Sequence, residues 1–376
     1  MSGPLAGVRV VDLTQYVAGP YCTMVLADMG AEVVKVERPG GEVYRRQGPV
    51  FAPGGESASF LTLNRGKTSR QLDLRAPADR EILHAMLDEA DILVENSTPG
   101  TMERLELGFP ALHARHPGLV YVSISGYGQV GPDATRGGYD LVIQALSGLL
   151  SMTGPEGGDP AKVPIAALDF GSGLYGALGA LAALRERETT GRGRHVTTSI
   201  LECALAWLSM HIVTQGLGGE EPAAAGTRSP FFAPYEAFRA GDGHLVIVGT
   251  GGDDAWGRLC GALGLGRIRE DPRFAENASR VANAAALRDI IEAVLADRGV
   301  ADWTAVLEEA GVVCAPVQRL SQVLASEQVR ALGLIDTQEH PSAGVIPMVG
   351  TPLSFDGERA VSELPPPLLG RPTSGS

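Results

Sequence analysis

The amino-acid sequence predicts an α/β protein, in which a large parallel sheet covered by helices is joined to a smaller α+β domain. Two observations predict this class. Strand-like and helix-like runs alternate between residues 8 and 125, as they do in βαβ units. The chain has 376 residues, which is long for one simple core and suits about two domains.

The large domain begins with short apolar runs that predict buried strands, at residues 8–13, 31–37, 91–96 and 119–125. A helix is predicted between the first two strands, at residues 20–29, because Gly30 follows it as a stop signal. A second helix is predicted at residues 78–90, before the third strand. A glycine-rich loop at residues 126–138 then leads to a predicted helix at residues 139–150.

The next segment is the most apolar of the chain. Residues 163–184 are almost all apolar or small, with a single acid, Asp169, near the start. A turn at residues 189–194 follows, and it leads to a predicted strand at residues 195–199 and a helix from about Leu201.

A shift in composition at residues 216–229 predicts a linker. The unit beyond it is predicted to contain a strand at 244–248, a helix from about Asp253, helices at 284–297 and 301–310, and a strand at 312–317. The tail from about Gly344 is again strand-like. We therefore expect a large domain at residues 1–215, completed by about residues 330–376, and a small domain at residues 230–329.

Composition excludes several classes of function. The net charge of −13 argues against binding to nucleic acid or to an anionic membrane surface, although a local basic pocket for a small phosphorylated ligand stays open. The cysteines are widely spaced and form no C-x-x-C pair, so we expect no disulfide framework, no metal site and a reduced, cytoplasmic setting. The apolar run at 163–184 is too rich in small residues to suit a membrane span.

Asp169 stands two residues before a glycine pattern, Gly171, Gly173 and Gly176, that matches the dinucleotide fingerprint G-x-G-x-x-G. A carboxylate there would repel a pyrophosphate, and the acidic residue expected about 20 residues further on is missing. An NAD-dependent dehydrogenase is therefore a distant alternative. Asp169 could instead cap a helix, whose N-terminus would hold its carboxylate ionised, and such a carboxylate can act as a nucleophile.

Seven stretches in order change this interpretation: 11–37, 63–75, 91–100, 123–132, 139–148, 166–173 and 189–202. Together they resemble the class III CoA-transferases, a group that includes formyl-CoA and carnitine CoA-transferases and the related α-methylacyl-CoA racemases. The resemblance implies a Rossmann-like large domain with a parallel sheet, a smaller α+β domain and an interlocked homodimer. It implies a CoA thioester as substrate, a small carboxylic acid as second substrate, and no tightly bound cofactor.

The resemblance also implies roles for particular residues. Asp169 matches the family's nucleophile, so we expect an acyl-CoA:carboxylate CoA-transferase that works through an aspartyl anhydride and an aspartyl-CoA thioester. Gly171 and Gly173 leave room for an acyl group and offer amides to an oxyanion, with Tyr139 and Tyr127 in the same pocket. The positions that match the family's CoA contacts are Tyr16, Val17, Ala18, Arg38, Leu72, Arg75, Asn96, Ser97 and Arg104.

The choice between transferase and racemase depends on one position. The racemases resemble one another in a G-H-D motif, whose histidine exchanges protons at the α-carbon together with the aspartate. This sequence has Gly138-Tyr139-Asp140, and tyrosine is a poor base at neutral pH. The sequence therefore favours the transferase, with a 2-methylacyl-CoA racemase or epimerase, and a non-catalytic CoA-binding relative, as alternatives. Val17 replaces the glutamine of formyl-CoA transferases, so formate and oxalate are not supported as substrates.

Overall fold

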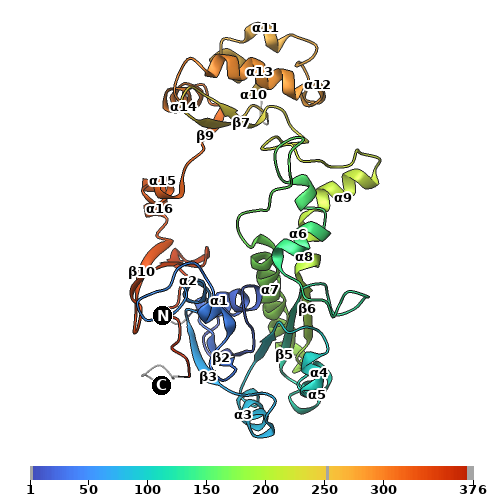
Figure 1. Ribbon diagram of the computed structural model, residues 1–376, viewed down its shortest axis with the longest axis vertical. Coiled ribbons are helices and arrows are strands. Elements are labelled where there is room, and N and C mark those ends of the chain that lie inside the picture. Colours follow the sequence, from blue (N-terminus) through green and yellow to red (C-terminus); the bar gives the residue numbers. More distant parts are fainter. Residues whose placement is uncertain (1–2, 251–253, 371–376) are drawn as a thin grey trace. The chain divides into compact units, whose positions relative to one another are not determined.

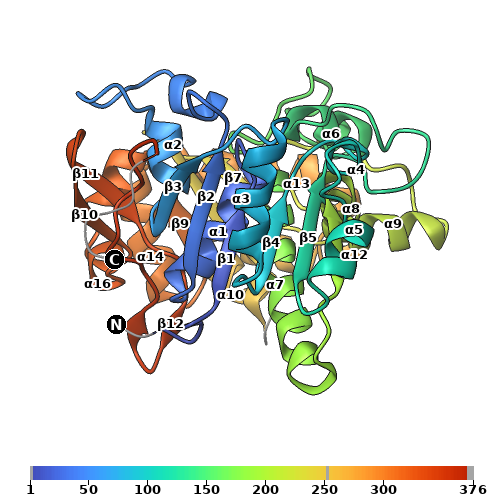
Figure 2. The ribbon, with the colours of Figure 1, turned by 90° about the horizontal axis from the view of Figure 1, so that it is seen from below.

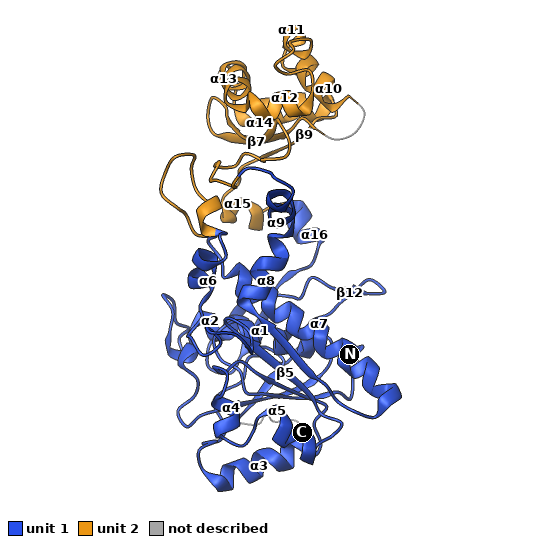
Figure 3. Cartoon of the chain, turned by 90° about the vertical axis from the view of Figure 1, so that its right-hand side faces the viewer, with its two compact units in different colours: residues 1–149, 163–220, 327–376 blue, residues 150–162, 221–326 orange. Residues whose placement is uncertain are grey.

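The structure is a computed structural model that describes residues 3–250 and 254–370, and it divides the chain into two compact units (Figures 1 and 3). Unit 1 comprises Met1–Leu149, Val163–Glu220 and Glu327–Ser376, and unit 2 comprises Leu150–Lys162 and Glu221–Ser326. The chain thus enters unit 2 twice.

The sequence predicted one connection to the small domain, a linker at residues 216–229. In the structure the chain also enters unit 2 earlier, at residues 150–162. Residues 150–162 belong with unit 2 because they bond to the segment after residue 220. The Gly226 N–H donates to the Gly154 carbonyl oxygen over 2.9 Å, and Arg228 pairs with Glu156 at 3.1 Å. Such long-range pairing leaves no local pattern in the sequence.

Unit 1 is built on a parallel sheet, as predicted. Its strands lie in the order β3-β2-β1-β4-β5-β6, and every neighbouring pair is parallel. The bounds are β1 Arg9–Asp12, β2 Glu32–Glu37, β3 Lys67–Gln71, β4 Ile92–Glu95, β5 Val120–Ser125 and β6 His195–Ser199 (Figure 2). This is the Rossmann strand order, in which the connections change direction between β1 and β4.

Helices cover both faces of the sheet, because side chains of successive strand residues point to opposite sides. Val10 and Val94 pack with α1 and α7 on one face, whereas Val11 and Leu93 pack with α3 and its neighbours on the other. The helices of unit 1 are α1 Ala18–Asp28, α2 Ala58–Leu63, α3 Pro77–Leu87, α4 Thr101–Arg104, α5 Phe109–Arg115, α6 Asp140–Leu146, α7 Ala167–Thr190, α8 Ile200–Trp207, α9 Ser209–Gly216 and α16 Glu327–Ala331.

Strand β3 was not predicted, because its sequence KTSRQ is polar. Lys67 is nonetheless fully buried, since its ammonium group lies 3.0 Å from the Asp12 carboxylate and also donates to Asn64. Burial alone would raise the pKa of Asp12, but Lys67 and Lys35 lower it to about 2. An ion pair thus replaces the apolar contacts that usually mark a buried strand.

The long helix α7 is the central helix of unit 1. By length and hydropathy it could cross a membrane, but its small residues pack inside the protein. A Cβ at Gly176 would lie 2.9 Å from Ile124 of β5, and one at Gly179 would lie 2.4 Å from Val196 of β6. The glycines of α7 therefore allow it to approach the sheet closely.

The C-terminal segment returns to unit 1. It forms two antiparallel pairs, β10 Ile335–His340 with β11 Gly344–Val349, and β12 Ser354–Phe355 with β13 Glu358–Arg359. Asp28, at the end of α1, pairs with Arg65 and accepts hydrogen bonds from Thr351 and from the Ser362 N–H. The first and last parts of the chain are thereby joined.

Unit 2 is an α+β unit, in which the antiparallel sheet β7-β8-β9 packs against helices. Its strands are β7 Tyr235–Arg239, β8 His244–Val248 and β9 Val313–Pro316, and its helices are α10 Ala255–Ala262, α11 Gly266–Arg269, α12 Asn277–Ala282, α13 Ala284–Leu295, α14 Val300–Glu309 and α15 Leu320–Leu324. The helix predicted from about Asp253 corresponds to α10, and Asp253 itself lies outside the described residues.

Candidate active site

The candidate site lies where β1 and β4 end side by side. The carboxyl ends of these strands flank the change of direction in the sheet, which is where open α/β sheets bind ligands. A cavity of about 180 Å³ opens there. Its lining includes seven of the predicted site residues: Tyr16, Val17, Ala18, Asn96, Ser97, Tyr139 and Asp169.

Asp169 is the acid of this cavity. It is the third residue of α7 and half-buried. Its carboxylate makes no hydrogen bond or ion pair with residues 3–250 or 254–370. Burial, and then the negative charge of Asp140, raise the pKa of Asp169 to about 7. Burial and the charge of Asp140 therefore oppose the ionised form that a helix N-terminus favours.

The capping role considered for Asp169 belongs to another residue. Helix α7 begins at Ala167, with Ala166 at the N-cap position. Asp140 Oδ2 accepts hydrogen bonds from the N–H groups of Leu168 (2.8 Å) and Asp169 (3.4 Å). Because Asp140 satisfies these free N–H groups, the Asp169 side chain is not needed as a cap.

Gly171 and Gly173 do not have the predicted oxyanion role. Both lie beyond the first turn of α7, where N–H groups bond within the helix, and neither lines the cavity. A Cβ at Gly171 would lie 2.4 Å from Trp207, and one at Gly173 would lie 2.5 Å from the Ala18 carbonyl oxygen. These glycines instead let α7 pack closely on α8 and α1. The fingerprint pattern is thus a helix-packing pattern.

Tyr16 has an unusual backbone at the mouth of the cavity. Its φ of 64° lies in the left-handed region, which a tyrosine rarely adopts. The buried carboxylate of Glu42 accepts the Tyr16 N–H over 3.1 Å and also faces Lys35 at 3.3 Å. The Tyr16 ring meets the exposed Tyr139 ring edge-on, with 6.0 Å between ring centres. Buried charges therefore hold a strained turn beside the cavity.

Tyr127 lies behind the cavity and does not line it. Its ring packs in a small core with Ile143 and Leu168, and its buried hydroxyl has no hydrogen-bond partner among residues 3–250 and 254–370. Arg136 places its guanidinium over this ring, 5.4 Å from the ring centre. Tyr127 therefore supports the wall of the cavity.

The predicted CoA-binding residues fall into two adjacent cavities. Arg38, Leu72 and Arg75 line a second cavity of about 300 Å³, and Gln15 lines both. Arg104 lines neither; it donates a hydrogen bond to Thr101 within α4. One continuous strip of surface thus connects the acid of the site to two exposed arginines.

Sequence reasoning missed several residues of these cavities. Gln15, Arg136 and Gly138 line the first, and Glu42 lines the second. Arg136 is the basic residue of the glycine-rich loop, and this position could have identified it as a site residue from the sequence. Nothing in the sequence distinguishes Glu42, because its role depends on burial beside Lys35.

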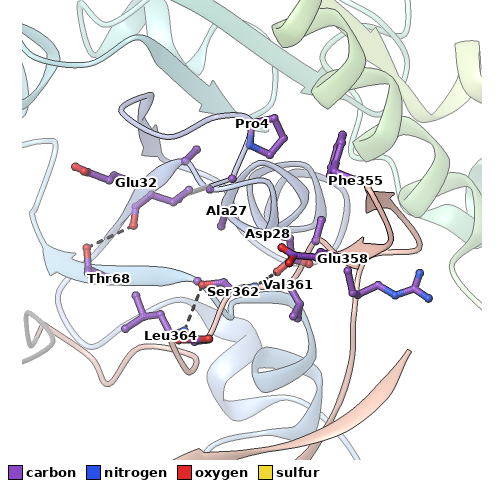
Figure 4. A pocket seen from close by; sticks show the side chains of 18 of the residues that line it. Pro4, Ala27, Asp28, Glu32, Thr68, Phe355, Glu358, Val361, Ser362 and Leu364 are labelled. Carbon is purple, nitrogen blue, oxygen red and sulfur yellow. Dashed lines mark hydrogen bonds between the residues drawn. The ribbon is translucent and has the colours of Figure 1, made fainter. Parts of the chain in front are cut away.

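A larger cavity of about 600 Å³ lies elsewhere in unit 1 (Figure 4). It is lined by the amino ends of β2 and β3, the end of α1 and the C-terminal segment. Asp28 lies there, but its carboxylate is already bonded to Arg65, Thr351 and Ser362. The Asp28 carboxylate is therefore not a free nucleophile in this cavity. Among the described residues, no group of His, Cys, Asp or Glu could hold a metal ion.

Comparison with known proteins agrees with this geometry. The model of CoA-transferase family III matches residues 5–373. The chain is 37% identical to succinyl-CoA:glutarate CoA-transferase of Mus musculus, over 98% of this chain and 85% of that protein. It is also 37% identical to succinyl-CoA:mesaconate CoA-transferase of Haloarcula hispanica, over 94% of this chain and 90% of that protein.

Solved structures give the same result. The chain matches a CAIB/BAIF family protein from Brucella suis with a TM-score of 0.86 and 33% identity, over 98% of this chain and 97% of that chain. A protein from Mycobacterium tuberculosis matches with a TM-score of 0.87 and 33% identity, over 98% of both chains. The chain therefore belongs to CoA-transferase family III and is a CoA-transferase.

Proposed function

We propose that this enzyme is an acyl-CoA:carboxylate CoA-transferase whose nucleophile is Asp169. The observation that carries the proposal is the position of this carboxylate, unpaired among the described residues and lining a cavity at the switch point of the sheet. Moving CoA between two acids requires that the energy of the thioester is kept in covalent intermediates. A carboxylate is suited to this because it forms an anhydride with an acyl group.

The proposed reaction has two symmetric halves. An Asp169 Oδ atom attacks the thioester carbonyl, and the CoA thiolate leaves as the mixed anhydride forms. The thiolate attacks the Asp169 carbonyl carbon, which gives an aspartyl-CoA thioester and releases the first acid. The acceptor carboxylate then attacks this thioester, and the freed thiolate attacks the acceptor's acyl carbonyl. Asp169 is regenerated, and no general base is needed because every nucleophile is an anion.

The second cavity supports a CoA thioester as substrate. CoA carries several phosphate charges, and guanidinium groups pair well with phosphate. Arg38 and Arg75 bring such groups to this cavity, where Arg75 is paired with Asp73 at 3.0 Å and would exchange that partner for a phosphate. Since Gln15 lines both cavities, a CoA bound along the arginines would direct its thioester toward Asp169.

We propose a dicarboxylic acid as acceptor. The named relatives act with succinyl-CoA and with glutarate or mesaconate. Arg136 brings a guanidinium to the cavity that holds Asp169, which suits the second carboxylate of such an acid. We also propose that the enzyme works in a reducing, cytoplasmic setting, which is consistent with its free cysteines.

A homodimer is part of the proposal. Large apolar side chains are exposed along α7, α8 and α9, including Leu178, Trp207, Met210 and Val213. Exposed apolar side chains in such number on three successive helices suit an interface. The interlocked arrangement itself is proposed from the family resemblance.

The test is chemical trapping. The enzyme is incubated with succinyl-CoA and then with hydroxylamine, and the modified residue is mapped by mass spectrometry. We expect a hydroxamate at Asp169, and we expect Asp169→Ala to lose roughly a thousandfold or more of the exchange activity. The matched control is Asp289→Asn, which changes an exposed acid of α13.

Two outcomes would reject the proposal. Unlabelled Asp169 together with full activity of Asp169→Ala would exclude this nucleophile. Deuterium exchange at the α-carbon of a 2-methylacyl-CoA, in the absence of any acceptor acid, would favour the racemase of the same fold.

A further inference from the structure

One buried carboxylate joins the two helices that carry Tyr139 and Asp169 to the cavity. Asp140 is the first residue of α6 and is buried. Its Oδ2 atom accepts the Leu168 and Asp169 N–H groups of α7, while its Oδ1 atom accepts a hydrogen bond from Gln144. The start of α7 is therefore fixed to α6 by a side chain that does not line the cavity.

Gln144 extends this connection. It lies one turn after Asp140 on α6 and is fully buried. Its Oε1 atom accepts the Val163 N–H over 3.1 Å. The two side chains of α6 therefore hold both ends of the segment 163–169 that leads to the nucleophile.

We propose that Asp140 is a positioning residue of the transfer reaction, which fixes the start of α7 so that the Asp169 carboxylate lies in the cavity and which brings a second negative charge close to it. The inference rests on the proposed function of Asp169. It goes beyond that function because it assigns a role to a residue that touches no substrate.

The charge of Asp140 is the reason to infer more than a structural cap. Asparagine at position 140 would offer an oxygen of the same reach to these N–H groups without bringing a second negative charge close to Asp169. No ion pair with a cation is recorded for Asp140 within the described residues. Its charge thus acts on Asp169 in a buried setting, and this agrees with the raised pKa of Asp169. A more basic carboxylate is also a stronger nucleophile once it is ionised.

The other groups near Asp169 do not explain such an effect at neutral pH. Burial raises the pKa of the Cys203 thiol to about 11 and that of Cys22 still further. Burial, together with Tyr139, raises the pKa of Tyr16. Arg136 stays cationic. The titratable or charged groups that share the cavity with Asp169 are Tyr139, Tyr16 and Arg136. Asp140 approaches Asp169 from α6, whereas Cys203 and Cys22 pack against Gly171 and Gly176 further along α7.

The experiment compares pH profiles of kcat/KM for CoA transfer in the wild type, Asp140→Asn and Asp140→Ala. We expect the wild type to lose activity as the pH falls through about 7, because Asp169 becomes protonated. Asp140→Asn keeps an acceptor for the α7 N–H groups, but it removes the charge and the acceptor of the Gln144 amide. The acidic limb of its pH profile should move to lower pH, and its maximal kcat/KM should stay within about tenfold of the wild-type value. Asp140→Ala also removes the acceptor, and its plateau should fall on the order of 100-fold.

The outcomes are separable. If both variants lose activity uniformly, with the acidic limb unmoved, Asp140 is only structural and the inference is overturned. It is equally overturned if Asp140→Ala keeps the wild-type profile. Trapping on the wild type distinguishes the two proposals. Failure to label Asp169 rejects this residue as the nucleophile. A labelled Asp169, together with Asp140 variants whose acidic limbs stay at the wild-type pH, rejects only the role of Asp140. Asp289→Asn again controls for a change of net charge.

Discussion

Asn96 and Gln15 exchange two hydrogen bonds across the ends of β4 and β1. The Asn96 side-chain amide donates to the Gln15 carbonyl oxygen over 2.8 Å, and the Gln15 N–H donates to Asn96 Oδ1 over 2.9 Å. One side chain therefore completes the backbone of the turn that lines both cavities.

Asn96→Ala should weaken binding of the CoA thioester. It leaves two polar groups of the turn without partners, at about 1 kcal/mol each, so we expect KM to rise by up to roughly 30-fold. Steady-state kinetics over a range of succinyl-CoA concentrations measure this. Asn96→Asp keeps the acceptor for the Gln15 N–H and should lose less. Equal KM values for all three proteins would show that the turn does not depend on this pair.

Arg38→Ala and Arg75→Ala should each raise KM for the CoA thioester several-fold, because each removes a guanidinium from the cavity beside Gln15. The effect should shrink as salt is added, since both side chains are exposed and salt screens their charge. Arg330→Ala, an exposed arginine of α16, is the control. An unchanged KM in both variants would place the phosphates elsewhere.

Asp169→Asn should stabilise the fold above neutral pH. Folding raises the pKa of Asp169 from 3.8 to about 7, so the folded chain binds the proton more tightly than the unfolded chain. Stability from this group is therefore lost as the pH rises from about 4 to 7. The variant carries no charge and should melt a few degrees above the wild type at pH 8, with a smaller difference at pH 5. Calorimetry at both values measures this, and a lower melting temperature at pH 8 would contradict it.

Gly173→Ala should destabilise the protein by about 2 kcal/mol or more, because the added Cβ would lie 2.5 Å from the Ala18 carbonyl oxygen. The same strain would shift α7 and lower activity. Gly261→Ala is the matched control, since this exposed glycine of α10 has no atom within 4 Å of an added Cβ. That change should be neutral or stabilising. Denaturant unfolding of both variants measures the contrast, and equal stability would contradict the packing role of Gly173.

The sequence predicted the apolar strands of the sheet well, because Val8–Leu13 and its counterparts bury side chains on both faces. Strand β3 was missed because its buried Lys67 depends on Asp12, which lies 55 residues away along the chain. A charge that is neutralised from such a distance has no local signature.

Some features of the candidate site could likewise be predicted from the sequence, and others could not. Asp169, Asn96 and Tyr139 could be named from motifs, and the structure brings them to one cavity. The role of the α7 glycines could not be read, because G-x-G-x-x-G describes both a phosphate loop and a close helix contact. The cap of α7 was assigned to the wrong acid, since Asp140 reaches Leu168 across 28 residues.

The contacts of Asp28 with Thr351 and Ser362 have a consequence for biosynthesis. A ribosome makes the first strands of unit 1 long before it makes the residues that complete the partners of Asp28 and Arg65. Until residues 351–362 leave the exit tunnel, this buried acid lacks two of its donors. The sheet domain can therefore reach its final form only after that segment has been made, whereas the intervening unit, which has its own core, is free to fold earlier.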